Sequence, residues 1–423
     1  MRIVFTALFF IALLPIHDAA AQQDTTTLTV AQCEDRFLAS NVRLLAARLN
    51  IDAAEAAIVQ AAVWNNPNLA VDQNLYNRFS HRVLDVTKSG NTDIQLQQLF
   101  VLAGKRGKQV RLAEISRESA RRTFEDVLRS LRYELRTDHA DLYYLQRSLR
   151  FYDESIGTLT ETVASAEAVY AQRSLLLAEL LRLKSLLLSL QNDRLDILTK
   201  IADLQAEMRT LMNDTSRTYY RVVLDRERVT APLPDSLSLE TVVAAAVEHR
   251  PDLAVSAASV EYETANLALQ QALQIPDLTV GAHYSRAGNY VPDYLGVTFS
   301  IDLPFFNRNQ GNIAVSERTI EMNRAMVQSV RQTVVREATA AFEALRATDQ
   351  TLRGVDRNFP EQYGALASGM AENYRKRNIT IIEFTDFFES YRASTLQFLR
   401  MENARVDAAE RLNYTAGVPL IRF

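Results

Sequence analysis

Leu28-Thr29-Val30 opens a helical stretch that closes at Pro67-Asn68-Leu69, and the pattern returns at Leu237-Ser238-Leu239 and Pro276-Asp277-Leu278, shifted by 209 residues. Later landmarks return at a shift of 204 residues, which matches Gly107 to Gly311, Tyr170 to Tyr374 and Glu179 to Glu383. The offset between the two copies changes from 209 to 204 residues within the segment that carries the strands and a loop. The two copies therefore differ in loop length and not in helix length. The pattern predicts two copies of one supersecondary unit.

The repeat sets the expected domain boundaries. We expect a first repeat over residues 22–213, a linker over 214–236 and a second repeat over 237–423. Residues 1–21 combine Arg2, an apolar run and the small-residue end Ala19-Ala20-Ala21, which is the layout of a cleavable export signal. A buried N-terminal helix is the alternative, but Pro15 and Asp18 would spoil its end.

Helices of unusual length fill most of each copy. Residues 105–172 predict one helix, because apolar residues recur at three-and-four spacing and proline is absent from 68–231. At 1.5 Å per residue such a helix reaches about 100 Å, which no compact globule accommodates. A return helix is predicted over 175–212, with a leucine stripe wide enough to need neighbours on more than one side.

The second copy predicts the same pair of helices, over 312–375 and 379–416. Its first helix is less regular, and a kink or a short helical segment is expected at the breakers Gly354, Pro360, Gly364 and Gly369. The fold class is therefore mainly α, with a small β part.

Four short segments alternate between apolar and polar residues. They start near Leu69, Ile94, Leu278 and Leu295, and they form two hairpins of strands about nine to eleven residues long. The polar positions predicted to line a watery lumen are Asp72, Asn74, Asp93, Gln95, His283 and Asp302. Aromatic residues near the strand ends suit a membrane interface: Trp64, Tyr76, Phe100, Tyr284, Tyr290, Tyr294, Phe305 and Phe306.

Those strands support two interpretations. After residue 21 there is no apolar run of eighteen residues, so an exported chain that meets a membrane must cross it with strands. Four strands cannot close a barrel, so the barrel would be shared by chains, three giving twelve strands or two giving eight. The alternative is a half-buried sheet in a soluble domain.

Composition excludes several classes of function. The net charge of -4 and the pI near 5.9 offer no field that attracts nucleic acid. The sequence has no nucleophile motif, no phosphate loop and no His/Cys cluster, so we expect neither an enzyme nor a cofactor or metal site. The single cysteine, Cys33, is expected to pack as a small apolar residue.

Several local motifs carry a resemblance to a known family. They are Trp64-Asn65-Asn66-Pro67-Asn68-Leu69, Gln98-Leu99-Phe100 with Gly104-Lys105-Arg106, and Asp302-Leu303-Pro304-Phe305-Phe306-Asn307-Arg308-Asn309-Gln310-Gly311. With the paired repeat, this chain resembles the TolC outer-membrane efflux family, and Ala287-Gly288-Asn289-Tyr290 with the Leu-Pro-Phe-Phe-Asn-Arg run most resembles its CzcC-like branch. The similarity runs from about Leu28 to Leu420.

The resemblance implies a homotrimer in the outer membrane of a Gram-negative bacterium. Long helical hairpins would form a twelve-helix tunnel across the periplasm, below a shared twelve-stranded barrel with four strands per chain. Such a channel is closed at its inner tip and opens with a periplasmic adaptor protein and an inner-membrane pump of the resistance-nodulation-division class. The cargo would be metal cations or, as the second choice, small toxic compounds.

The two helix turns would form the periplasmic tip. They carry Tyr170, Arg173, Tyr374, Arg375, Lys376 and Arg377, and such a cationic tip could steer an acidic adaptor surface. A solvated helix end whose cations sit near a carbonyl terminus accounts equally well for the first turn.

Glu383 and Asp386 lie just past the second turn, three residues apart on one helix face. In the family that this chain resembles, acidic residues here line the tunnel entrance, and three copies would form a ring of carboxylates that selects cations. An ordinary solvated helix face is the alternative. For the whole chain, the alternative to a passive duct is a non-conducting periplasmic scaffold of long helices.

Overall fold

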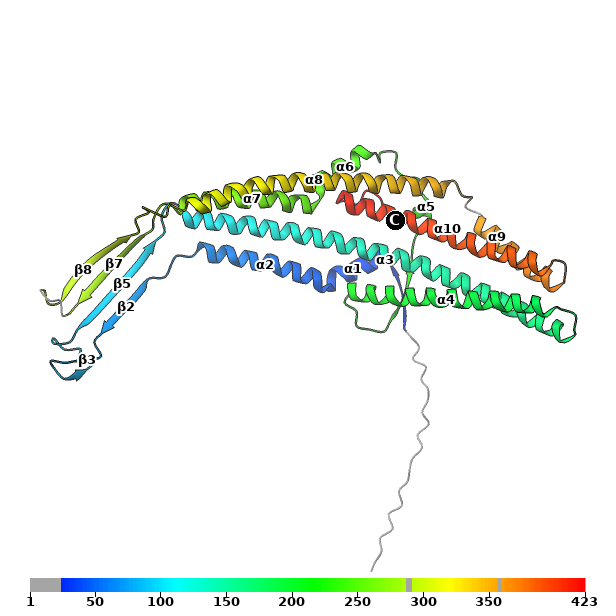
Figure 1. The fold of residues 1–423 in the computed structure, drawn as a ribbon, viewed down its shortest axis with the longest axis horizontal. Helices are drawn as coiled ribbons and strands as arrows, with labels where there is room; N and C mark the ends of the chain where they lie inside the picture. The colour runs from blue at the N-terminus through cyan, green and yellow to red at the C-terminus, as the bar shows by residue number, and fades with distance from the viewer. Residues whose placement is uncertain (1–23, 287–290, 357–358, 423) are drawn as a thin grey trace, which may run out of the picture.

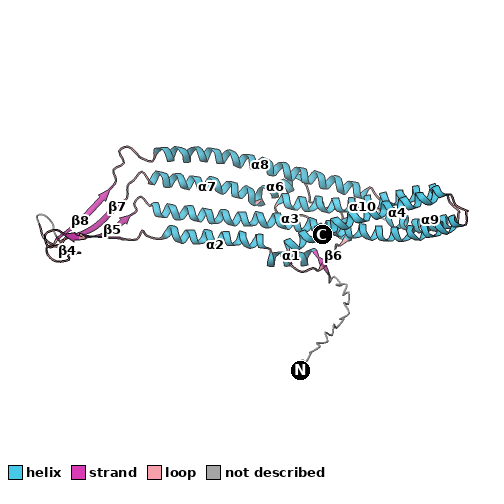
Figure 2. Ribbon diagram, turned by 60° about the horizontal axis from the view of Figure 1, so that its bottom comes forward, coloured by secondary structure: helices cyan, strands magenta, loops and turns pink. Residues whose placement is uncertain are grey.

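The computed structural model describes residues 24–286, 291–356 and 359–422. The predicted export signal and Tyr290 lie outside these residues. Long helices run side by side along the molecule, and a sheet extends beyond one end of them (Figures 1 and 2). A chain of this shape places its strands and its helix turns at opposite ends.

The long helices agree with the prediction to within two residues at nearly every end. They are α3 (Lys105–Ala171), α4 (Leu177–Leu211), α8 (Gln310–Arg353), α9 (Phe359–Arg375) and α10 (Ile381–Ala416). The second copy's first helix is broken as expected: α8 ends at Gly354, and the short helix α9 continues toward the turn. Gly364 and Gly369, however, lie inside α9 and do not interrupt it.

Each half of the chain begins with a pair of shorter helices. These are α1 (Val30–Ser40) and α2 (Val42–Ala62) in the first half, and α6 (Leu239–His249) and α7 (Pro251–Ala272) in the second. Thr29 caps α1 and Ser238 caps α6, each in a capping box with the residue three positions on. The two openings noticed in the sequence are therefore equivalent helix starts.

The strands form one open antiparallel sheet of four, in the order β2 (Asn68–Gln73), β5 (Thr92–Phe100), β7 (Leu278–Ser285) and β8 (Tyr294–Ile301). The expected length of nine to eleven residues holds for β5, which has nine, but β7 and β8 have eight each and β2 has only six. The chain beyond β2 instead folds into a small hairpin of β3 (Tyr76–Asn77) and β4 (Arg82–Val83).

A second, two-stranded sheet lies halfway along the helices. β1 (Thr25–Thr29) pairs in parallel with β6 (Tyr219–Val223), which belongs to the linker between the two halves. The short helix α5 (Arg226–Thr230) follows. No motif in the sequence of this linker, residues 214–236, predicted these two elements.

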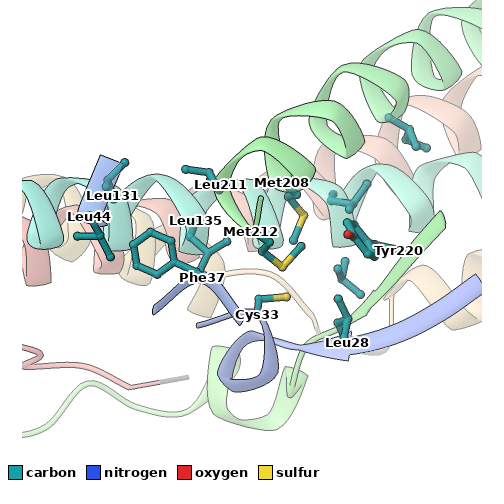
Figure 3. Packing of buried hydrophobic residues seen from close by; sticks show 13 residues of the cluster. Leu28, Cys33, Phe37, Leu44, Leu131, Leu135, Met208, Leu211, Met212 and Tyr220 are labelled. Carbon is teal, nitrogen blue, oxygen red and sulfur yellow. The ribbon is translucent and has the colours of Figure 1, made fainter. Parts of the chain in front are cut away.

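A hydrophobic core joins this small sheet to the long helices (Figure 3). Leu28, Phe37 and Cys33 from the N-terminal segment pack with residues of α3 and α4 such as Leu135 and Met208. Cys33 has no exposed surface, which confirms its predicted packing role, and burial raises its pKa to about 12. Within the described ranges, no helix has an apolar stretch long enough for a membrane crossing.

Candidate functional site

The polar face of the sheet brings together four of the six predicted lumen residues. Asp72 lies directly opposite Asp93, and Gln95 lies directly opposite His283. The His283 Nε2 atom is 3.4 Å from Asp93 Oδ1. Asn74 and Asp302 lie one residue beyond the ends of β2 and β8, so they belong to the rims of the sheet and not to its middle.

The opposite face of the sheet is apolar and exposed. Leu69 lies opposite Leu96, and Val71 lies opposite Ile94. On the edge strand β8, Val297 is 67% exposed and Phe299 is 71% exposed. The sheet therefore does not bury its apolar face against the chain's own helices, as a soluble half-buried sheet would.

Several of the predicted interface aromatics lie exposed near the strand ends. The exposed members are Trp64, Tyr76, Phe100, Tyr294, Phe305 and Phe306. The guanidinium of Arg106, in the first turn of α3, lies 4.0 Å from the centre of the Trp64 ring. Tyr284 is half-buried, and its hydroxyl donates a hydrogen bond of 2.8 Å to Asp293 Oδ1.

The two helix turns at the far end have the same local geometry. The N–H of Arg173 donates to the Tyr170 carbonyl at 2.8 Å, and the N–H of Arg377 donates to the Tyr374 carbonyl at 2.9 Å. Both arginines have a positive φ, 57° for Arg173 and 62° for Arg377, a region that glycine usually occupies. The sequence analysis had no signal for this left-handed conformation.

Contacts between the turns place them side by side. Arg377 Nη2 donates to the Ser174 carbonyl at 3.2 Å, and Arg375 pairs with Glu161 at 3.4 Å. Lys376 pairs with Glu372 at 2.6 Å on its own helix, and this bond lowers the pKa of Glu372. Arg173 forms no ion pair within the described residues.

A cavity of about 430 Å³ lies between the two turns. Tyr374 lines it, stacks on Phe384 with ring centres 5.1 Å apart, and leaves its buried hydroxyl without a hydrogen-bond partner in the described structure. Tyr170, its counterpart in the first repeat, is 39% exposed. The two tyrosines are equivalent in the sequence but differ in environment.

Glu383 and Asp386 differ in what they contact. The Glu383 carboxylate accepts hydrogen bonds from the N–H (2.7 Å) and hydroxyl (2.9 Å) of Thr380, which forms a capping box at the start of α10. These bonds lower the pKa of Glu383. Asp386 is exposed, and its nearest cation is Arg182, 4.0 Å away.

Sequence reasoning missed a buried group of charges where the linker crosses the helices. Arg405 on α10 bonds Asp349 Oδ1 through Nε (2.9 Å) and donates to the carbonyls of Val229 and Ala231. One turn earlier, Glu402 is fully buried and accepts from Arg226 at 2.6 Å. Charged residues are common along a long helix, so the sequence gave no signal that Arg405 and Glu402 are the ones that contact the linker.

The described residues contain no cluster of three or more His, Cys, Asp or Glu side chains that could hold a metal ion.

Comparison with known proteins covers most of this chain. Residues 35–214 and 242–418 match the family model described as outer membrane efflux protein. The cobalt-zinc-cadmium resistance protein CzcC of Cupriavidus metallidurans is 25% identical over 392 residues, which cover 81% of this chain and 88% of that protein.

Solved structures share the fold. A crystal structure of CusC matches with a TM-score of 0.73 at 15% identity and covers 92% of each chain. The CmeC outer membrane channel of Campylobacter jejuni matches with a TM-score of 0.73 at 12% identity, covering 92% of this chain and 86% of that one. The mainly helical fold with a small β part is thereby confirmed.

Proposed function

The chain belongs to the outer membrane efflux protein family, and on that premise we propose that three copies form one export duct, a shared barrel of twelve strands above a sheath of long helices. As a member of that family the chain is the outer-membrane channel component of a tripartite efflux system, and it is not an enzyme. Its location in the outer membrane of a Gram-negative bacterium, predicted from sequence, is also confirmed. Membership of this family favours the predicted export duct over the alternative, a non-conducting periplasmic scaffold.

The open sheet is the observation that carries the proposal of a shared barrel. Both edge strands, β2 and β8, have one side without a partner strand among the residues that the structure describes. In lipid each unpaired backbone group costs several kcal/mol, so a membrane sheet has to close on itself. Four strands are too few for closure, and sister copies supply the missing edges. Three copies follow the resemblance to the TolC family, whereas two would give the smallest closed barrel.

Cross-linking the sheet edges tests the number of copies. Ala70 on β2 and Thr298 on β8 both lie on the polar face, so cysteines at these positions would meet across a joint between copies. With a short bifunctional thiol reagent, the double variant should give a covalent ladder that stops at three chains. A ladder that stops at two chains, or no ladder, contradicts the trimer. Each single-cysteine variant is the control, and Cys33 stays unlabelled because it is buried.

We propose that the wall of the duct favours cations at two levels. The barrel level consists of the polar-face residues Asp72, Asn74, Asp93, Gln95, His283 and Asp302. The entrance level is a ring of Glu383 and Asp386 from each copy. Since Glu383 is engaged in capping α10, Asp386 supplies the more available charge.

Single-channel recording separates the two entrance carboxylates. Asp386→Asn should lower the cation-to-anion permeability ratio, because a ring of fixed charges at a constriction sets that ratio. Glu383→Gln, in which glutamine preserves the capping box and removes the charge, should lower the ratio less, because this carboxylate is engaged in the cap. If the double variant keeps the wild-type ratio, the entrance ring is wrong.

The cationic tip is proposed to dock an adaptor protein that links the channel to a pump of the resistance-nodulation-division class. Arg173 and Lys376 are exposed there, and opposite charge on an adaptor would speed its association. Arg173→Glu with Lys376→Glu should weaken capture of the cognate adaptor, mainly through a slower association rate. The same two charge reversals at Arg324 and Arg331, exposed on α8, are the control. Equal loss in both variants contradicts docking at the tip.

The cargo is proposed to be a metal cation. The CzcC relative is named for resistance to cobalt, zinc and cadmium, and the acidic wall suits a cation. Small organic compounds are the second candidate. Growth of a deletion strain across metal salts and drugs, with and without the restored gene, decides between them: sensitivity to drugs alone contradicts metal export.

A further inference from the structure

The loop between β2 and β5 buries two polar side chains and exposes its apolar ones. Over residues 74–91, Asn77 and Asp85 are only 4% and 2% exposed. Phe79, by contrast, is 96% exposed and Leu75 is 72% exposed. In a water-soluble loop the burial is the other way round.

Hydrogen bonds to Asp85 hold this inverted loop together. Its carboxylate accepts from Asn77 Nδ2 at 3.1 Å, from the Ser80 hydroxyl, and from the N–H (3.0 Å) and hydroxyl (2.6 Å) of Thr87. A side chain at Gly90 would have no room, because its Cβ would lie 1.5 Å from the Asp85 carbonyl oxygen. The exposed side chains are therefore presented by a defined scaffold.

The loop exposes apolar residues and three Arg or Lys cations, together with His81 and the uncharged polar residues Thr87, Ser89 and Asn91. The apolar ones are Leu75, Tyr76, Phe79, Val83, Leu84 and Val86, and the cationic ones are Arg78, Arg82 and Lys88. No ion pair within the described residues involves these three cations. The loop's only carboxylate, that of Asp85, points inward, so its outer surface is positive although the whole chain carries a net charge of -4.

The position of the loop in the fold indicates which kind of partner it would contact. The loop continues β2 at the end of the sheet that points away from the helices (Figure 1). Val71 and Leu69 of β2 belong to the exposed apolar face, which the proposed barrel turns toward lipid. A loop beyond that face, with apolar and basic side chains together, matches the chemistry of an anionic lipid surface.

We propose that the loop of residues 74–91 docks on the outer leaflet of the membrane, inserting its apolar side chains among lipids whose phosphates Arg78, Arg82 and Lys88 contact. The inference rests on the proposed barrel, which puts this end of the sheet at the outer surface of the cell. It gives the channel an anchor that depends on lipid charge.

An environment-sensitive fluorophore on the loop tests the docking. Phe79→Cys would be labelled with bimane, which Cys33 does not compete for because it is buried. The labelled channel is reconstituted into vesicles of phosphatidylcholine alone or with phosphate-bearing lipid A. We expect a blue shift of emission with lipid A, and a smaller shift at high salt because salt screens the attraction.

A charge-neutral triple variant, Arg78→Gln, Arg82→Gln and Lys88→Gln, should lose the dependence on lipid A. Each basic residue near an anionic surface contributes about fivefold in partitioning, so the ratio of lipid-contacting to solvent-exposed label should fall about a hundredfold. The matched control neutralises Arg324, Arg331 and Arg346 on α8, which are equally exposed. This control should keep the shift.

Two results would overturn the inference. One is equal emission in both kinds of vesicle, and the other is a blue-shifted emission already present in detergent, which would mean that another copy of the chain covers the loop. Conductance of the same vesicles is recorded in parallel. Conducting vesicles without a lipid-dependent shift contradict the anchor alone, whereas non-conducting vesicles contradict the channel.

Discussion

Replacing Arg405 by methionine should release the linker from the helices that hold it. The guanidinium is 2% exposed, and it joins Asp349 of α8 to the carbonyls of Val229 and Ala231 at the end of α5. Methionine fills a similar volume but offers no donor. The buried Val229 carbonyl would then be left without this donor, whereas the Ala231 carbonyl lies at an exposed residue where water can replace it.

The cost can be worked out from these contacts. A buried acceptor left unsatisfied costs about 1–3 kcal/mol, so loss of the donor to the Val229 carbonyl costs about 2 kcal/mol, and the Ala231 carbonyl adds little. Asp349 keeps a partner, because Arg353 still bonds its other oxygen at 2.8 Å. About 2 kcal/mol corresponds to about thirtyfold in the equilibrium for local opening.

Hydrogen exchange measures this opening directly. The amides of Val229 and Ala231 donate to the carbonyls of Asp225 and Arg228, and they exchange only when the linker opens. In Arg405→Met their exchange should be faster by about thirtyfold, while amides in the middle of α3 keep their wild-type rate. Uniform acceleration through α3 as well would mean general unfolding and not release of the linker.

Arg228→Met is the matched control for that experiment. Arg228 lies in the same short helix, is 66% exposed and, among the described residues, forms an ion pair only with Asp225, at 3.1 Å. An exposed pair of this kind contributes about 0.5 kcal/mol, so exchange should change about twofold. The reasoning is refuted if Arg405→Met leaves linker exchange unchanged, or if both variants accelerate it equally.

Three further predictions concern single groups. Cys33 in the native protein should resist maleimide at pH 8 and react fully after unfolding, because burial raises its pKa to about 12; rapid native labelling would contradict its packing. Burial is the main reason that the pKa of Asp138 is raised to about 7, so the native state should lose stability as pH rises from about 4 to about 7. Asp138→Asn should flatten that decline in a series of thermal melts at different pH values. If the melting temperature of the variant falls with pH as steeply as that of the wild type, Asp138 is not the group responsible. Glu383→Ala should destabilise the start of α10 through loss of the capping box, whereas Glu383→Gln should not, as hydrogen exchange at the Glu383 amide would show; equal protection in both variants contradicts the cap.

The long helices could be predicted from the sequence because the features that favour a helix act over short stretches of the chain. The helix predicted over 105–172 is observed over Lys105–Ala171, since the 3.6-residue period and the missing prolines act within a few turns. The break at Gly354 was visible for the same reason. Gly364 and Gly369 were weaker signals: a single glycine costs a helix only about 1 kcal/mol, which α9 tolerates.

The pairing of β1 with β6 could not be predicted in the same way. Thr25 lies beside Tyr219, and nothing in either short segment specifies a partner so far along the chain. The threonines of β1 and the tyrosines of β6 do favour strands, which was the available signal. Similarly, alternation placed Asp72 and Asp93 on one face, but only the register of the hairpin places them opposite each other.

The entrance residues show how one sequence pattern can have two meanings. Glu383 and Asp386 looked equivalent because they share a helix face, and that face was all the spacing could show. Thr380 stands three residues before Glu383, a threonine-to-glutamate spacing typical of a capping box, and this signal was present in the sequence. A carboxylate bonded to its own helix start is held close to the backbone, whereas Asp386, exposed one turn later, can extend toward an ion. If an entrance ring exists, its selectivity should therefore follow Asp386, and Glu383 should govern how firmly α10 begins.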